Sequence, residues 1–245
     1  MPPMPRKTTD DAADAGRPHP ASLRDMPLFG GLGAAAMADI LRLGRQQDLP
    51  RGAVLFDQGA AATGFQLLLR GFLKVVQTGP DGRQIVIRIV GPREPAGVLA
   101  LLGPDQVYPA TVLAMVPSVV LSWTGAALQE VREHHPALAL NAMRALGART
   151  QEAHARLREA AGDPVERRLA ATVLRLAAQI GSRGEGGAIA IGAPLTRQDL
   201  AELAGTTLAT ASRVLSAWKQ AGILGGGRMR LVVRDRRMLA RLAGG

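Results

Sequence analysis

Cysteine is absent from this sequence of 245 residues, and aromatic side chains make up only 3% of it. The lack of cysteine excludes disulfides, thiolate zinc sites, cysteine-ligated iron–sulfur clusters and a cysteine nucleophile. So few aromatic residues argue against a surface that stacks many nucleic-acid bases on rings. Pro109 and Pro117 interrupt the most apolar stretch, 107–123, which is shorter than the ~20 residues of a membrane span. The N-terminus has no apolar core of a secretory signal, so we expect a cytoplasmic protein without a membrane partner.

The charge balance is strongly basic, with 30 Lys and Arg against 20 Asp and Glu and a net charge of +10. Residues 163–245 hold 13 Lys and Arg against 6 Asp and Glu, whereas residues 1–162 hold 17 against 14. The C-terminal third therefore carries a net +7 of the total, which favours a polyanionic partner for that segment. A generally arginine-rich composition without a focus is the alternative interpretation.

Composition divides the chain into four segments. Residues 1–20 are rich in Pro, Asp, Ala and Gly and are expected to form a disordered arm. Residues 21–130 contain short β-branched and apolar runs separated by Gly and Pro, which predicts a small antiparallel barrel or roll. A long helix is expected within 131–162, and a separate C-terminal domain over 163–245.

Two local patterns refine the β-rich segment. Pro80-Asp81-Gly82 predicts a turn between two strands. In the strand that follows, Ile85, Ile87 and Ile89 are expected on one face and Arg88 on the other.

The helix expected from Pro136 to Ala161 carries a heptad repeat of apolar and small residues. The repeat consists of Ala139, Met143, Leu146, Thr150, Ala153, Leu157 and Ala160. A narrow apolar stripe of this kind favours pairing with a second copy of the helix, so Met143, Leu146, Thr150, Ala153 and Leu157 form a predicted dimer seam. The alternative is a helix that lies on the β-rich domain. Asp163 is expected to cap the next helix, with Pro164 at its first position.

Two helices joined by a glycine turn are predicted in the C-terminal domain. Thr196 and Asp199 form a capping box, so the first helix is expected to begin at Arg197. Gly205 supplies the turn, and a second helix runs from about Thr207. This is the helix-turn-helix pattern.

The second helix has one apolar face and one face of small polar residues around a single arginine. Ala211, Val214, Leu215 and Trp218 are expected inward. On the other face, Arg213 can donate two hydrogen bonds to guanine in a DNA major groove. A glycine-rich turn then leads into a predicted β-hairpin wing. The predicted DNA-contacting residues are Thr196, Arg197, Thr206, Thr207, Ala209, Thr210, Ser212, Arg213, Arg228 and Arg230.

Several of these motifs together resemble the Crp/Fnr superfamily of bacterial transcription regulators, over nearly all of 22–242. The resembling residues are Gly52, Leu55-Phe56, Gln58-Gly59, Gly71, Gly97, the long helix and Ala211-Ser212-Arg213-Val214-Leu215. The resemblance implies an α+β fold with an N-terminal antiparallel β-roll of the cyclic-nucleotide-binding type, a dimerisation helix and a C-terminal winged helix-turn-helix. It also implies a homodimer that reads a near-palindromic operator in double-stranded DNA and contacts RNA polymerase.

The sequence departs from the family members that bind cyclic AMP. Their Gly-Glu-Leu run is Gly97-Val98-Leu99 here, and their Arg-Ser pair falls on Tyr108-Pro109. Without that carboxylate and guanidinium, we expect a pocket with no cationic partner and no tight binding of cyclic nucleotides. The apolar side chains that remain are Val98, Leu99, Leu101, Leu102, Tyr108, Val112 and Leu113, with Pro109 beside them.

The effector is left open by the sequence. The run from Tyr108 to Ser118 resembles the nitric-oxide-responsive, denitrification-linked branch, which would imply haem in a hydrophobic site. The alternative is a pocket filled by its own side chains or by an unknown effector. Surface positions are expected for His19, His134, His135 and His154 rather than haem ligation.

A DNA-binding regulator is favoured over the other classes of function. No phosphate loop, metal cluster or nucleophile–base pair is identifiable, so we expect neither an enzyme nor a metal protein. Ala209 stands where many members carry a glutamate, and Leu208 replaces another polar residue. These two changes keep open a second interpretation, a sensing or interaction module that has lost productive operator binding.

Overall fold

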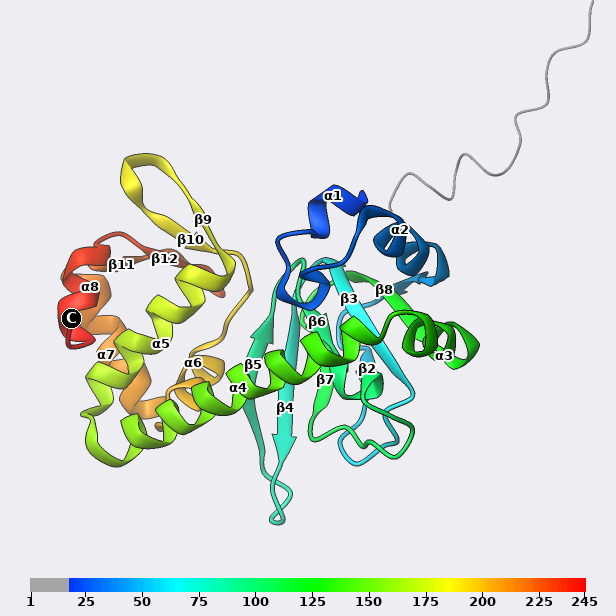
Figure 1. Cartoon of the computed structure of the whole chain (residues 1–245). Coiled ribbons are helices and arrows are strands. Elements are labelled where there is room, and N and C mark those ends of the chain that lie inside the picture. The colour runs from blue at the N-terminus through cyan, green and yellow to red at the C-terminus, as the bar shows by residue number, and fades with distance from the viewer. Residues whose placement is uncertain (1–17) are drawn as a thin grey trace, which may run out of the picture.

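The computed structural model describes residues 18–245, and residues 1–17 of the expected arm lie outside the described part. A β-roll and a helical C-terminal domain lie side by side, and one long helix, α4 (Pro136–Gly162), runs along both of them (Figure 1). The roll consists of two antiparallel sheets with strand orders β1-β8-β3-β6 and β2-β7-β4-β5. Its strands are β1 (Arg45–Leu49), β2 (Val54–Phe56), β3 (Gly64–Arg70), β4 (Leu73–Thr78), β5 (Gln84–Val90), β6 (Pro95–Ala96), β7 (Thr111–Ala114) and β8 (Ser118–Thr124).

Both faces of the central strand β3 are buried, as its continuous apolar run suggests. One side faces the second sheet, where Leu68 packs in a cluster with Leu73 and Val120. On the other side, Phe65 and Leu67 join a cluster with the helices that flank the roll. These helices are α1 (Pro20–Leu23), η1 (Pro27–Phe29), α2 (Ala34–Leu43), η2 (Val98–Leu101), α3 (Gly125–His134) and α4 (Pro136–Gly162). The expected arm is therefore shorter than 20 residues, because α1 begins at Pro20 and the His19 Nδ1 atom accepts a hydrogen bond from its Ala21 amide.

The long helix α4 buries its N-terminal end against the roll. Leu138 and Ala142 are buried there, and the amide of Asn141 donates to the carbonyls of Leu28 and Gly30 at 3.0 and 2.9 Å. Further along, Met143 and Leu157 are 52% and 67% exposed. The N-terminal turns thus lie on the β-rich domain, whereas the later turns present an uncovered apolar stripe.

The C-terminal domain is a winged helix-turn-helix, as expected. Its elements are α5 (Val165–Ile180), β9 (Gly181–Arg183), η3 (Glu185–Gly187), β10 (Ile189–Ile191), α6 (Arg197–Leu203), α7 (Leu208–Gln220), β11 (Leu224–Gly225), β12 (Leu231–Val233) and α8 (Arg236–Leu242). These strands form one antiparallel sheet in the order β11-β12-β10-β9. No helix in the described part of the chain is both long enough and apolar enough to span a membrane.

Two local predictions are wrong. Asp163 does not cap α5: that helix has Pro164 at its N-cap position, and the Asp163 carboxylate lies 3.4 Å from the guanidinium of Arg167 instead. The isoleucines of β5 do not share one buried face, since Ile85 is 39% exposed while Ile89 is buried. The reason is a register shift between β4 and β5, which leaves Ile87 unpaired and reverses the alternation. The turn predicted at 80–82 does join these two strands.

Candidate functional site: a DNA-reading helix and an interdomain cavity

The turn between α6 and α7 is fixed by local caps and by one arginine of α5. Thr196 and Asp199 form the predicted capping box, in which the Asp199 amide donates to the Thr196 hydroxyl at 3.0 Å. Gly205 has a φ of +63°, a left-handed conformation that suits glycine. The Arg168 guanidinium donates to the carbonyls of Ala204 and Gly205 at 3.2 and 3.0 Å. These contacts set the angle at which α7 leaves α6.

The predicted faces of α7 are found in the structure. Ala211, Leu215 and Trp218 are buried, and the Trp218 indole donates to the Glu166 carboxylate at 3.0 Å. Arg213 is exposed on the opposite face and makes no hydrogen bond or ion pair within the described residues. Its guanidinium is therefore available to a ligand outside the chain.

The other predicted DNA-contacting residues surround Arg213 in different states. Thr207 caps α7, and its hydroxyl also bonds that of Thr210 at 3.0 Å, so both hydroxyls are already engaged. One nitrogen of Arg197 donates to the Ser212 carbonyl at 3.1 Å and ties α6 to α7. The remaining positions are Thr196, Thr206 and Ala209 on the two helices and the turn, and the exposed Arg228 and Arg230 in the wing.

A cavity of about 780 Å³ extends from the roll to the C-terminal domain. Its lining includes the five predicted pocket residues Val98, Leu99, Tyr108, Pro109 and Val112. Leu101 and Leu102 instead pack among the flanking helices, and Leu113 lines a second crevice. The far wall comes from α4, α5 and the residues Glu202 to Gly205 at the end of α6.

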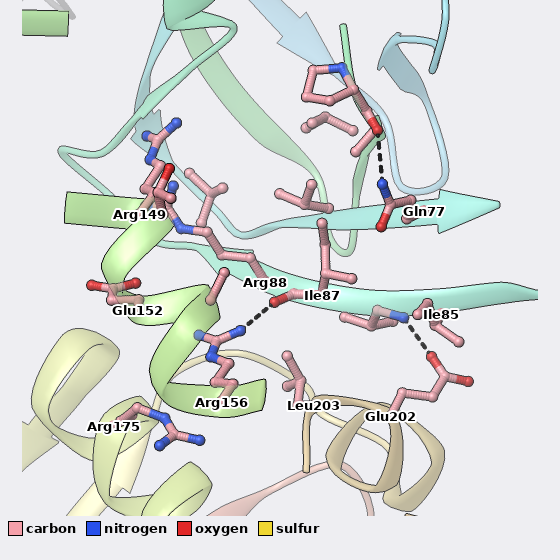
Figure 2. Close-up of a pocket in the computed structure, with 18 of the residues that line it drawn as sticks. Gln77, Ile85, Ile87, Arg88, Arg149, Glu152, Arg156, Arg175, Glu202 and Leu203 are labelled. Atoms are coloured by element: carbon pink, nitrogen blue, oxygen red, sulfur yellow. Dashed lines mark hydrogen bonds between the residues drawn. The ribbon is translucent and has the colours of Figure 1, made fainter. Parts of the chain in front are cut away.

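The expectation of a pocket without a cationic group is wrong. Arginine side chains line this cavity from three elements. Figure 2 shows Arg88 from β5, Arg149 and Arg156 from α4, and Arg175 from α5. Arg168 of α5 also belongs to the lining. The expectation considered only the family's phosphate-binding position on the roll, whereas these arginines come from β5 and from helices outside the roll. Arg149 and Arg156 are seven residues apart and so share one face of the helix, but the sequence alone does not show what covers that face.

Tyr108 is a buried part of the cavity lining. Its ring stacks on Phe56 with the ring centres 3.8 Å apart, and its hydroxyl donates to the Gly64 carbonyl at 2.6 Å. Burial raises the pKa of this hydroxyl above its usual value. Tyr108 is therefore a neutral part of the wall.

The lining of the cavity does not fit haem ligation. It contains no histidine or methionine, and its one tyrosine is engaged as described. His134 and His154 are exposed elsewhere. His135 is not a surface residue as expected: its side chain is only 10% exposed and contacts the Asp39 carboxylate at 2.9 Å. Hydrogen bonds from Arg42 and then His135 lower the pKa of Asp39.

The bulged strand β5 connects the roll to both neighbouring helices. Its unpaired residue Ile87 offers a carbonyl that accepts from Arg156 of α4 at 2.7 Å. The adjacent amide of Val86 donates to the Glu202 carboxylate of α6 at 2.7 Å (Figure 2). Side chains of β5 and α6 also share one buried cluster, which contains Val86, Ile89, Leu200 and Ala204. The helix-turn-helix thus contacts the roll mainly through β5, and Lys74 of β4 adds an ion pair with Asp199 of α6 at 4.0 Å.

We expect Glu202→Ala to loosen this docking. Losing a charged acceptor costs about 1.5–3 kcal/mol, so deuterium exchange of the Val86 amide should speed up by about tenfold or more. Glu202→Gln keeps an acceptor oxygen and should remain close to wild type. Hydrogen–deuterium exchange of a peptide spanning 84–90 measures the effect. Equal exchange in Glu202→Ala and wild type would show that this contact does not hold the domains together.

Comparison with known proteins agrees with this architecture. Residues 46–135 match the family described as Cyclic nucleotide-binding domain, and residues 167–242 match Crp-like helix-turn-helix domain. The chain belongs to the Crp/Fnr family of transcription regulators. Its β-rich N-terminal domain, long helix and C-terminal helix-turn-helix match the fold of CRP-like structures.

Regulators from several bacteria are similar over most of this chain. The CRP-like cAMP-activated global transcriptional regulator of Mycobacterium tuberculosis is 27% identical over 88% of this chain and 96% of its own length. The Cyclic AMP receptor protein of Thermus thermophilus is 26% identical over 91% and 99%. A solved CRP-family transcriptional regulator of the same organism is 25% identical, with a TM-score of 0.64 over 81% and 97%. FixK2 of Bradyrhizobium japonicum shares the fold at 19% identity, with a TM-score of 0.69 over 81% and 96%.

Proposed function

We propose that this Crp/Fnr-family protein is a homodimeric, sequence-specific transcription regulator that acts on promoter DNA in the cytoplasm. The observation that carries the proposal is the exposed Arg213, which pairs with no described residue and lies on a helix whose opposite face is buried. Small neighbours such as Ala209 and Ser212 let the backbone approach base edges, and Arg213 reads guanine in the major groove. A contact with RNA polymerase completes the activity that the family resemblance implies.

Phosphate contacts hold the helix in register. Arg228 and Arg230 of the wing are exposed and reach one strand of the duplex. Thr196, Thr206 and the amides at the start of α7 contact the other side of the groove. Thr207, Thr210 and Arg197 already form hydrogen bonds within the domain, and these bonds shape the N-terminal end of α7. In the proposed complex the same three residues also contact phosphate.

Pairing of α4 with its copy gives the dimer. Met143 and Leu157 of the seam are largely exposed in the single chain. Leu146, Thr150, Ala153 and Leu157 also line the cavity. The partner helix therefore covers both the exposed stripe and the open side of the cavity.

The effector is a ligand of this cavity other than cyclic AMP. Val98 and the Tyr108-Pro109 pair replace the ribose- and phosphate-binding groups of the family members that bind cyclic AMP. Membership of the nitric-oxide-responsive branch rests on the run from Tyr108 to Ser118 alone, and the donor set of the cavity counts against haem. Leu208, which is 47% exposed at the start of α7, is the feature that favours the alternative of a sensing module without an operator.

Selection of bound duplexes from a random pool tests the proposal. We expect enrichment of an inverted repeat whose half-sites lie about one helical turn apart. Affinity should fall by about 10³-fold or more between roughly 50 and 200 mM salt, because arginine–phosphate contacts release counterions. A pool without an enriched motif, bound with little salt dependence, would favour the sensing module instead.

A further inference from the structure

Two arginines of the cavity differ from the other three in how they are paired. Arg88 and Arg175 have the carboxylates of Glu94 and Glu159 as partners, at 2.5 and 3.0 Å. Arg168 donates to three backbone carbonyls. By contrast, Arg149 and Arg156 form no ion pair with any described residue. They donate only to single carbonyls, of Pro95 at 3.3 Å and of Ile87 at 2.7 Å.

The surroundings of these two side chains disfavour an unpaired positive charge. Burial lowers the pKa of the Arg149 guanidinium to about 10, and the charge of Arg88 contributes. Burial and then the charge of Arg175 lower the pKa of Arg156. The Nε atom of Arg156 is also buried without a hydrogen-bond partner. A buried cation is costly until an anion or a full set of acceptors compensates it.

The surface of the cavity as a whole is mostly apolar. Its apolar lining includes Val75, Ile85, Ile87, Val90, Leu146 and Leu157. Three carboxylates, those of Glu152, Glu159 and Glu202, also border the cavity. Glu159 is paired with Arg175, and none of the three forms an ion pair with Arg149 or Arg156 among the described residues, although the charge of Glu152 partly offsets the lowering of both arginine pKa values. A ligand that fits this space has one compact anionic group and an apolar body.

We propose that the cavity binds a small organic anion with an apolar body, and that Arg149 and Arg156 of α4 hold its anionic group. The inference rests on the proposed function in that this ligand is the effector of the regulator. It places the anion on the long helix, rather than on the Tyr108-Pro109 segment of the roll. Arg156 also donates to the Ile87 carbonyl of β5, next to the Val86 amide that bonds Glu202. The ligand would therefore compete with this carbonyl for the Arg156 guanidinium, which ties α4 to β5.

A pair of fluorescent probes with one ring system separates charge from apolar binding. The anionic probe is 8-anilinonaphthalene-1-sulfonate, and the neutral one is N-phenyl-1-naphthylamine. For Arg149→Gln and Arg156→Gln, we expect Kd for the anionic probe to rise by about tenfold or more, because each variant loses a charge-assisted hydrogen bond to the sulfonate. Kd for the neutral probe should change less than twofold. The matched control is Arg158→Gln, which alters an exposed arginine of the same helix and should bind both probes like wild type.

Each other outcome counts against the proposal. Equal binding of the anionic probe by all proteins would show that the two arginines hold no anion. Parallel loss of both probes, or the same loss in Arg158→Gln, would indicate a non-specific or purely apolar site. Displacement of the anionic probe by cyclic AMP at about millimolar concentration would identify a nucleotide site instead. If Arg156→Gln unfolds, Arg149→Gln still tests the inference, because Arg149 donates to Pro95 of β6 and not to β5.

These measurements do not require DNA. If the anionic probe binds as expected while no operator is found, the cavity remains an anion site and only the proposed regulation fails. If an operator is found but Arg149→Gln and Arg156→Gln bind the anionic probe like wild type, the proposed regulator stands and the proposed anion site is wrong.

Discussion

Arg213→Ala is expected to reduce operator discrimination strongly, at one base position in each half-site, while leaving the protein folded and dimeric. A bidentate arginine–guanine contact contributes about 1–3 kcal/mol of discrimination. A dimer makes this contact twice, so the double loss is about 2–6 kcal/mol, or roughly 30-fold to more than 10⁴-fold in affinity. Folding should be unaffected because Arg213 is exposed and bonds no described residue. Fluorescence anisotropy with the selected operator and a scrambled duplex, at one salt concentration, measures the difference.

The wing provides the matched control for this prediction. Arg228→Ala removes an exposed arginine that the proposed docking places on phosphate, so operator and scrambled duplex should weaken alike. The salt slope should also fall by about one for each subunit. If Arg213→Ala behaved in the same way as Arg228→Ala, Arg213 would be a phosphate contact and another residue would read the sequence.

Elements whose conformation is set by residues close together in the sequence were predictable. The capping box of Thr196 and Asp199, the left-handed Gly205 and the spacing of Ala211, Leu215 and Trp218 each depend on residues within one or two turns. The helix-turn-helix therefore follows from local chemistry. Asp163 is an instructive exception, because a good capping residue at the right position pairs with a nearby arginine instead.

Features that depend on packing between distant segments were not predictable. The alternation of β5 is broken by a bulge against β4, and no residue of β5 marks that bulge. Arg149 and Arg156 look like solvated helix charges until the roll and the C-terminal domain close over them. Both failures concern the cavity, where the roll, α4 and α6 meet, so its charge could be known only after the domains were placed.

The second large effect is expected from charges in the dimer seam. Met143→Glu combined with Leu157→Glu places two carboxylates on each helix where the proposed pair packs most closely. Burying unpaired like charges costs several kcal/mol, so the variant should be a monomer at micromolar concentration. Operator affinity should then fall by about 10²–10⁴-fold, because each half-site must be bound without the avidity of the pair. Size-exclusion chromatography with light scattering, together with anisotropy, measures both effects.

The control for the seam comes from the opposite face of the same helix. Ala148 is exposed and lies nine residues before Leu157, or about half a turn away around the helix. Ala148→Glu should therefore remain dimeric and bind the operator like wild type. Since Met143 and Leu157 are already more than half exposed in the single chain, the double variant should keep its secondary structure. A double variant that still dimerised would place the interface on another surface, and the covering of the cavity by the partner helix would have to be abandoned with it.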